Sequence, residues 1–159
     1  MARALLAAAA LLAAVPGLAQ EAPTADRSQD LAWQSAQSLA LASRGSAQGW
    51  RQLDGGLRWR RVKGDGSGAH PKVTDMVTLH YAGSFVDGAE FDSSYGGPPA
   101  QFPLDRLIRA WQIAVPLMGV GDTIEIAVPA ELGYGFRGQG PIPGGATLLF
   151  KIELLGVGG

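Results

Sequence analysis

Apolar and polar residues alternate in three separate segments of the chain, and this alternation constrains the fold more than any other feature of the sequence. The segments cover residues 75–82, 123–129 and 146–155. A period of two places every second side chain on one face, which is typical of a half-buried β-strand. The stretch that follows Asp105 instead has apolar residues at helical spacing. We therefore expect an α+β fold, a curled antiparallel sheet or half-barrel wrapped over one central α-helix.

Turn and cap residues mark where these elements begin and end. The dipeptide Asp87-Gly88 lies between two apolar segments and predicts a β-hairpin, because glycine adopts positive φ at no steric cost. Asp105 is a suitable N-cap for the helix, and Pro116 is expected near its end. Shorter strands are expected over residues 57–62 and 102–104, and a glycine-rich loop over residues 131–145.

The N-terminus has the pattern of an export signal. Residues 1–19 contain a basic residue at Arg3, an apolar run over residues 4–15, and small residues at Gly17 and Ala19. The run is short for a membrane span, so we expect a signal peptide cleaved after Ala19 and a periplasmic or secreted product with no membrane span after cleavage. An uncleaved anchor is the alternative.

Residues 20–48 form a polar N-terminal extension in this interpretation, and residues 49–159 form the functional domain. The extension contains one modest helix, with Asp30 as its N-cap and Gly45 as its stop. The helix either docks on the body or pairs with a second copy of the chain, and docking is favoured because a dimerisation arm is usually longer.

Charge and cysteine content exclude several kinds of function. The formal charge is −1, and removal of Arg3 with the leader leaves 12 Lys and Arg against 14 Asp and Glu. Such a chain presents no strong field for nucleic acid, so none is expected as a partner. The absence of cysteine excludes a disulfide framework and a thiolate nucleophile.

The stretch Phe91-Asp92-Ser93-Ser94 raises the question of a serine nucleophile. A serine hydrolase needs a base to activate the hydroxyl, usually histidine. The chain has two histidines: His70 is expected in a loop, and His80 on the outward phase of the strand over residues 75–82. His80 is therefore interpreted as a surface or hydrogen-bonding residue, and a hydrolase is the least favoured alternative.

The region from Gly49 to Val157 resembles the FKBP family of peptidyl-prolyl cis-trans isomerases. The resemblance is carried by five strings in order and at near-family spacing, which are VTLHYAGSFVDGAEFDSS, LIRAW, LMGVGD, IAVPAELGYG and IPGGATLLFKIELL. It implies the same half-barrel fold and an apolar site between the sheet and the helix.

The resemblance also implies the site residues. Trp111 would form the floor, and Ile108 would offer its backbone N–H to a substrate carbonyl. Ser93 and Ser94 would belong to a turn. The implied catalytic residues are Tyr81, Phe91, Asp92, Ile108, Trp111, Tyr134 and Phe150, and the implied substrate-binding residues are Phe102, Leu107 and Ile142. No metal or cofactor is implied.

The implied function is acceleration of Xaa-Pro bond rotation during the folding of exported proteins. Catalysis would come from a water-excluding apolar pocket without a covalent intermediate. The expected partners are proline-containing polypeptides and macrolide inhibitors. The alternative is a chaperone-like binding module that holds proline-containing segments with little turnover.

Overall fold

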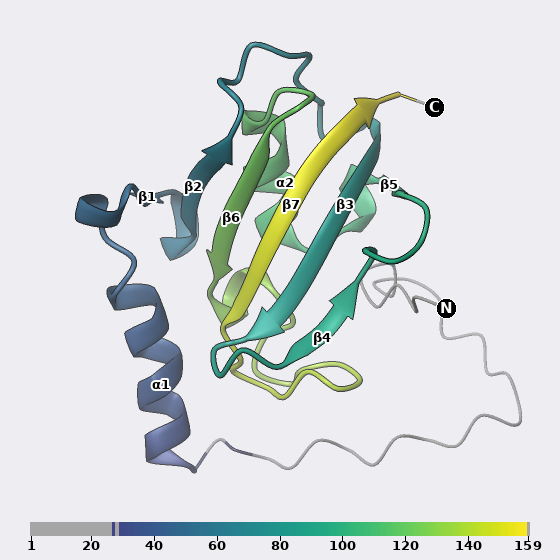
Figure 1. The fold of residues 1–159 in the computed structure, drawn as a ribbon. Coiled ribbons are helices and arrows are strands. Elements are labelled where there is room, and N and C mark those ends of the chain that lie inside the picture. The colour runs from purple at the N-terminus through teal and green to yellow at the C-terminus, as the bar shows by residue number, and fades with distance from the viewer. Residues whose placement is uncertain (1–26, 28, 159) are drawn as a thin grey trace, which may run out of the picture.

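A computed structural model describes residue 27 and residues 29–158, and one antiparallel sheet dominates it (Figure 1). The expected signal peptide, residues 1–19, lies outside the described residues. The sheet has seven strands in the order β1-β2-β6-β7-β3-β4, and β5 pairs with β3. The strands are β1 (Arg51–Gln52), β2 (Arg58–Lys63), β3 (Met76–Phe85), β4 (Glu90–Ser93), β5 (Ala100–Pro103), β6 (Thr123–Val128) and β7 (Leu148–Val157).

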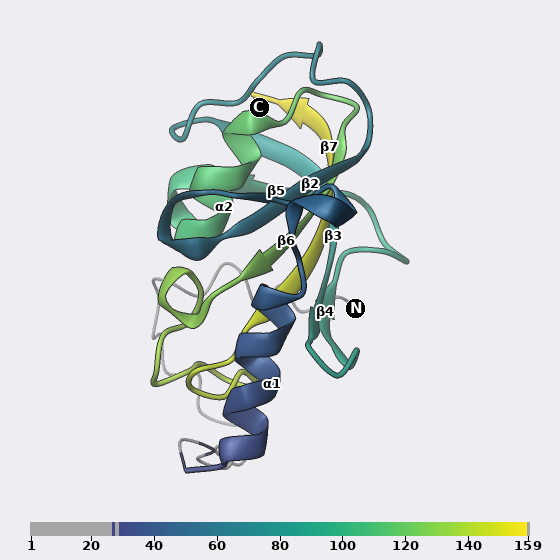
Figure 2. The same cartoon turned by 90° about the vertical axis from the view of Figure 1, so that its left-hand side faces the viewer.

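The sheet curves around a short helix, α2 (Arg109–Ala114), which lies on its concave side (Figure 2). Alternate residues of the long strands are buried against this helix, as the period of two predicts. Val77, Leu79 and Tyr81 of β3 are each at most 1% exposed, and Trp111 of α2 is fully buried. The expected α+β half-barrel over one central helix is therefore confirmed.

The β3–β4 hairpin forms at the predicted Asp87-Gly88 turn. The Phe85 N–H donates to the Ala89 carbonyl at 2.9 Å, and Gly88 has φ of +90°. The hairpin brings Gly83 of β3 opposite Asp92 of β4.

The central helix begins three residues later than predicted. Residues Leu104–Arg106 form a 3₁₀ turn, Leu107 is extended, and Ile108 is the N-cap of α2, so the expectation that Asp105 caps the helix is wrong. Leu104 and Leu107 are 0% and 4% exposed. The break in the helix lets both leucines enter the core, and their burial outweighs the capping preference of aspartate.

The N-terminal helix α1 (Leu31–Ala42) packs against the body near β6 (Figure 1). The Asp30 carboxylate accepts from the Trp33 N–H at 2.9 Å, so Asp30 is the N-cap as expected. Gln37 is 6% exposed, and its side-chain oxygen accepts from the Thr147 N–H at 2.9 Å. The Thr147 hydroxyl also donates to the Gln37 carbonyl at 3.3 Å. These two bonds fix α1 to the chain just before β7.

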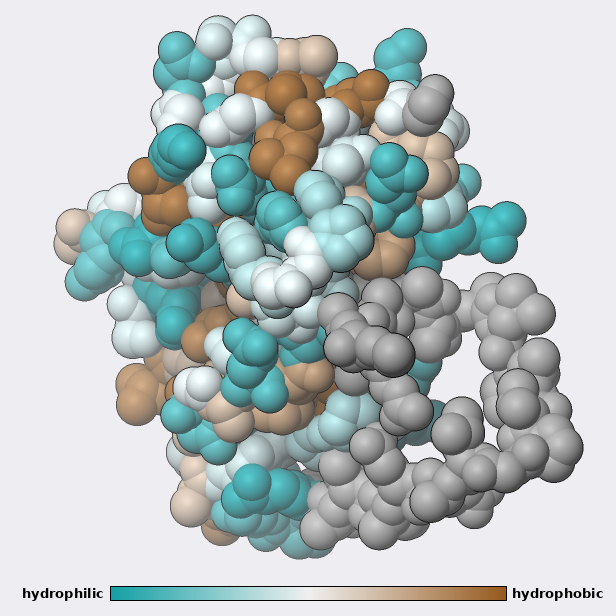
Figure 3. Space-filling model, turned by 45° about the vertical axis from the view of Figure 1, so that its right-hand side comes forward, coloured by the Kyte–Doolittle hydropathy of each residue, from teal (hydrophilic) through white to brown (hydrophobic). Residues whose placement is uncertain are grey.

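The outer surface mixes polar and apolar groups. On the face drawn in Figure 3, hydrophilic side chains surround separate small apolar patches. Among the residues that the structure describes, none belongs to a helix long and apolar enough to cross a bilayer.

Candidate active site

Three aromatic rings from three different elements meet at the centre of the concave face. The ring centroids of Tyr81 (β3) and Phe150 (β7) both lie 5.4 Å from that of Trp111 (α2), at interplanar angles of 79° and 89°. Both contacts are edge-to-face, the arrangement that aromatic quadrupoles favour. Trp111 is therefore held by two perpendicular rings, and its indole has a fixed orientation.

Two further rings extend this cluster toward its edges. Phe91 of β4 meets Phe150 at 5.6 Å and 88°, and Phe102 of β5 meets Tyr81 at 6.0 Å. Phe102 is buried, whereas Phe91 is half-buried and reaches the surface. Phe91 therefore gives the ring cluster a surface that a ligand can contact.

A glycine that the sequence analysis did not single out makes this packing possible. Gly83 lies opposite Phe150 in the β3–β7 register. A Cβ atom at this position would lie 2.6 Å from the Phe91 ring and 2.7 Å from the Phe150 ring. Glycine inside a strand often marks such a close approach, so a glycine within the strand predicted over residues 75–82 and its continuation could have indicated this packing.

The polar group of the site is a buried tyrosine–carboxylate pair. The Tyr81 hydroxyl donates to the Asp92 carboxylate at 2.7 Å, and Asp92 is 6% exposed. Burial and this hydrogen bond raise the pKa of Tyr81. Burial, with the charge of Asp92, raises the pKa of Tyr134 to about 12. Both phenols are therefore neutral hydrogen-bonding groups at physiological pH.

All ten residues implied by the resemblance lie in or against one apolar cluster. Leu107, Ile108 and Ile142 belong to its buried part, and Tyr134 packs against it. Ile108 is the N-cap of α2, so its N–H lies outside the hydrogen-bond ladder of the helix. The ten residues come from β3, β4, β5, α2, β7 and the loops beside α2 and β7.

The expectation that both Ser93 and Ser94 belong to a turn is wrong for Ser93, whereas Ser94 opens the turn after β4, its carbonyl accepting from the Gly97 N–H at 3.3 Å. Ser93 is the last residue of β4, and Ser94 is 5% exposed and follows the strand directly. The Ser94 hydroxyl accepts from the Tyr81 N–H at 2.9 Å and lies 2.9 Å from Nδ1 of His80. The His80 ring also stacks on that of Tyr95 at 5.0 Å. Because Ser94 is itself buried and its hydroxyl is engaged by these partners, it is poorly placed to attack a substrate carbonyl. Its bonds tie β4 to β3.

The remaining histidine is also engaged by the backbone. The two ring nitrogens of His70 lie 3.1 Å and 2.8 Å from the carbonyl oxygens of Pro116 and Gly66. Within residues 27 and 29–158, no group of three His, Asp or Glu side chains is arranged to hold a metal ion. The arrangement of the described residues favours an apolar recognition site over a hydrolytic or metal centre.

Comparison with known proteins shows that this chain is similar to peptidyl-prolyl cis-trans isomerases. Residues 67–155 match the family model described as FKBP-type peptidyl-prolyl cis-trans isomerase. The chain is 42% identical over 118 residues to the FKBP-type isomerase FkpA of Aeromonas hydrophila, covering 74% of this chain and 44% of that protein. It is 41% identical over 103 residues to FK506-binding protein 1A of Aspergillus fumigatus, covering 62% of this chain and 92% of that protein.

A crystal structure of a peptidyl-prolyl cis-trans isomerase from Pseudomonas syringae superimposes with a TM-score of 0.76 at 28% identity. The match covers 86% of this chain and all of that one. The chain spans about half the length of the bacterial curated relatives that it matches first.

Proposed function

Because this chain belongs to the FKBP-type peptidyl-prolyl cis-trans isomerase family, we propose that it accelerates rotation about Xaa-Pro bonds in exported polypeptides. The single observation that carries this proposal is the aromatic cluster in which Tyr81 and Phe150 hold the buried indole of Trp111 edge-on, and which reaches the surface at the half-buried ring of Phe91. This cluster offers a rigid apolar surface, accessible at Phe91, against which a proline ring can pack.

The chemistry requires no reactive group. Amide resonance gives a rotation barrier of ~18 to 20 kcal/mol, and an uncatalysed Xaa-Pro bond isomerises in tens to hundreds of seconds. The twisted transition state has lost this resonance and is less polar than the planar amide. A site that replaces water by aromatic rings therefore stabilises the twisted form more than the planar one, which lowers the barrier.

The polar atoms of the site would orient the substrate. We assign the Ile108 N–H and the Tyr134 hydroxyl as donors to substrate carbonyls, because both border the ring cluster. The Tyr81–Asp92 pair would form the polar rim, and its 2.7 Å hydrogen bond holds the Tyr81 ring in place against Trp111. Phe102, Leu107 and Ile142 would complete the apolar walls of the substrate-binding surface.

Isomerisation of a short Xaa-Pro peptide, with and without a macrolide of the FK506 type, tests this function. The macrolide is chosen because similar chains carry the name FK506-binding protein. We expect catalysis that one equivalent of macrolide abolishes and that a chelator or a serine-directed reagent leaves unchanged. Binding of the peptide without any acceleration would instead favour a module that holds proline-containing segments.

The domain division and location belong to the same proposal. Residues 1–19 would be a cleaved signal peptide, residues 20–48 an extension carrying α1, and residues 49–159 the isomerase domain. The basic residue, apolar run and small residues of the leader support export. The mass of protein recovered from the producing cell tests this, and an intact leader would favour a membrane anchor.

A further inference from the structure

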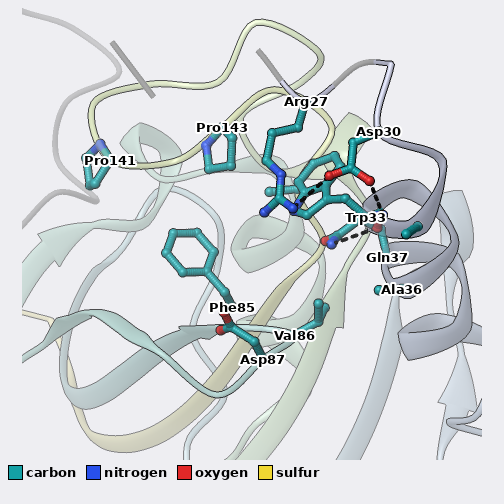
Figure 4. A pocket seen from close by; sticks show the side chains of 12 residues that line it. Arg27, Asp30, Trp33, Ala36, Gln37, Phe85, Val86, Asp87, Pro141 and Pro143 are labelled. Carbon is teal, nitrogen blue, oxygen red and sulfur yellow. Dashed lines mark hydrogen bonds and ion pairs between the residues drawn. The ribbon is translucent and has the colours of Figure 1, made fainter. Parts of the chain in front are cut away.

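A groove outside the residues assigned above lies between α1, the β3–β4 hairpin and the loop before β7 (Figure 4). Its volume is about 540 Å³, within the range of ~300 to 1,000 Å³ typical of ligand pockets. Phe85 projects from the hairpin toward the loop that carries Pro141 and Pro143, and Trp33 of α1 lies across from the hairpin. The walls are therefore largely apolar.

The groove is built from fixed elements. Gln37 and Thr147 hold α1 to the body through two hydrogen bonds, as described above. A Cβ atom at Gly145 would lie 3.5 Å from the Trp33 indole, so this ring packs directly on the loop backbone. Pro141 and Pro143 have restricted backbone freedom. A ligand entering the groove would find its walls already formed.

A continuous series of rings connects the groove to the proposed isomerase site. Phe85 lies 5.0 Å from Phe91, Phe91 lies 5.6 Å from Phe150, and Phe150 lies 5.4 Å from Trp111. An extended chain rises ~3.3 Å per residue, so a polypeptide whose proline packs against the ring cluster around Trp111 could reach Phe85 within about five residues. The same client chain can therefore occupy both places.

The charges at the rim define the ligand further. Arg27 and Asp30 pair with each other at 2.9 Å, and the Arg27 guanidinium lies 5.3 Å from the centre of the Trp33 ring. Asp87 at the opposite rim adds one carboxylate. The groove therefore suits an apolar side chain with neutral or basic neighbours, and it disfavours acidic ones.

We propose that this groove is an accessory subsite that binds an apolar or aromatic side chain of the client polypeptide, about five residues from the proline. The inference rests on the proposed isomerase function. It assigns α1 a role in substrate selection beyond its packing on the body. Binding far from the rotating bond contributes equally to ground and transition states, so it should lower KM and leave kcat unchanged.

Matched peptides test the subsite. Each pair shares one Xaa-Pro core and carries either Phe or Ser five residues from the proline, on its N-terminal side in one pair and on its C-terminal side in the other. With the full chain, we expect the Phe peptide of one pair to have a KM about tenfold lower, because burial of an aromatic side chain contributes at least this much to binding. Equal KM values within both pairs would overturn the proposal.

Substitutions on α1 test whether the KM difference between the paired peptides arises in the groove. Ala36 is exposed and lines the groove, so Ala36→Glu should fill it and remove the difference between the paired peptides. Ser35→Glu adds the same charge at the neighbouring exposed position, which does not line the groove, and should preserve the difference. Ala32→Glu, in the first turn of α1, also lines the groove and serves if Ala36→Glu unfolds the helix. A difference that survives both groove variants would contradict the assignment.

Other outcomes identify other occupants and would equally overturn the proposal. A peptide preference that appears only after removal of residues 1–26 would assign the groove to the chain's own N-terminal segment. A preference that disappears as protein concentration rises would assign it to a second copy. If neither peptide is isomerised at all, the isomerase function itself fails, and this result is distinct from equal turnover of the paired peptides.

Discussion

The Ser94 hydroxyl accepts a hydrogen bond from the backbone N–H of Tyr81 at 2.9 Å, and the Ser94 N–H donates to the Tyr81 carbonyl at the same distance. Both residues are at most 5% exposed. Ser94 therefore fixes the backbone of the residue whose side chain contacts both Asp92 and Trp111. Of the two serine hydroxyls that follow Asp92, the Ser94 hydroxyl therefore has a structural role, whereas Ser93 is only half-buried.

Ser94→Ala should lower the free energy of unfolding by about 1 to 3 kcal/mol, because it leaves the buried Tyr81 N–H without its acceptor. Ser93→Ala is the matched control, since Ser93 is only half-buried and its bonds are longer, at 3.1 and 3.3 Å. Its cost should stay within about 0.5 kcal/mol. Urea denaturation measures both. Equal stability of the two variants would contradict the structural role of Ser94.

Asp122 should be a major determinant of stability. It is 2% exposed, and its carboxylate accepts from the N–H groups of Gly119 and Gly66 and from the Arg61 guanidinium, at 2.9 to 3.1 Å. Burial by itself would raise the pKa of this carboxyl, but the three donors outweigh it and the pKa is lowered. Asp122→Ala should cost about 3 kcal/mol, since it leaves these donors without a partner.

The carboxyl group of Asp122 also predicts how the free energy of unfolding changes at acid pH. A lowered pKa in the folded state means that the stabilisation is fully present above the ordinary aspartate pKa and is lost as the pH falls from there through the lower pKa of the folded chain. The difference in stability between the natural chain and Asp122→Ala should therefore shrink at acid pH. Asp105→Ala, at an exposed position, is the control and should change little at any pH. A constant difference between pH 7 and pH 3 would contradict this account.

The three tyrosines should resist ionisation in alkaline solution. The pKa is raised for Tyr81, for Tyr95 and for Tyr134, in each case chiefly by burial, and for Tyr134 it reaches about 12. A free tyrosine is half ionised near pH ~10. The tyrosinate absorbance at that pH should thus be well below half its final value, and three tyrosines ionising together at pH 10 would contradict the buried site.

The free energy of unfolding in alkaline solution should also depend on these three tyrosines. Because the folded chain holds these protons more tightly than the unfolded chain, their contribution is complete below pH ~10 and is lost as the pH rises through the folded pKa values. Tyr134→Phe removes one ionisable phenol and should lessen the loss of stability between pH 10 and 12. An unchanged loss would indicate that Tyr134 is not buried beside Asp92.

The strands and the hairpin were predictable because their signals are local. Alternation over residues 75–82 and 146–155 depends only on which face is buried, and the Asp87-Gly88 turn depends only on backbone conformation. The convergence of the ten predicted residues followed from the family resemblance, and no single aromatic residue would have indicated it. Their catalytic and binding roles remain predictions.

Other features depend on contacts between distant residues. The helix starts after Ile108 because Leu104 and Leu107 both enter the core, which the cap signal of Asp105 does not reveal. The requirement for Gly83 arises from two rings on β4 and β7. The buried Gln37 that holds α1 is bonded to a residue 110 positions away. Polar residues of this kind are recognised only when their partners are known.

The most direct test of an apolar, non-covalent isomerase site is the isomerisation rate of a short Xaa-Pro peptide with Phe91→Ala and with Ser93→Ala. Truncating a buried aromatic costs up to ~3 to 5 kcal/mol of stability, so each variant is first shown to be folded at the assay temperature. Phe91 contacts both Phe85 and Phe150, and each aromatic contact contributes ~0.5 to 1.5 kcal/mol.

We predict that Phe91→Ala lowers kcat/KM about tenfold, which corresponds to ~1.4 kcal/mol of transition-state stabilisation, and that Ser93→Ala changes it by less than about twofold. A folded Phe91→Ala protein of normal activity, beside a folded and inactive Ser93→Ala protein, would contradict the account and return the hydroxyl to the centre of the mechanism.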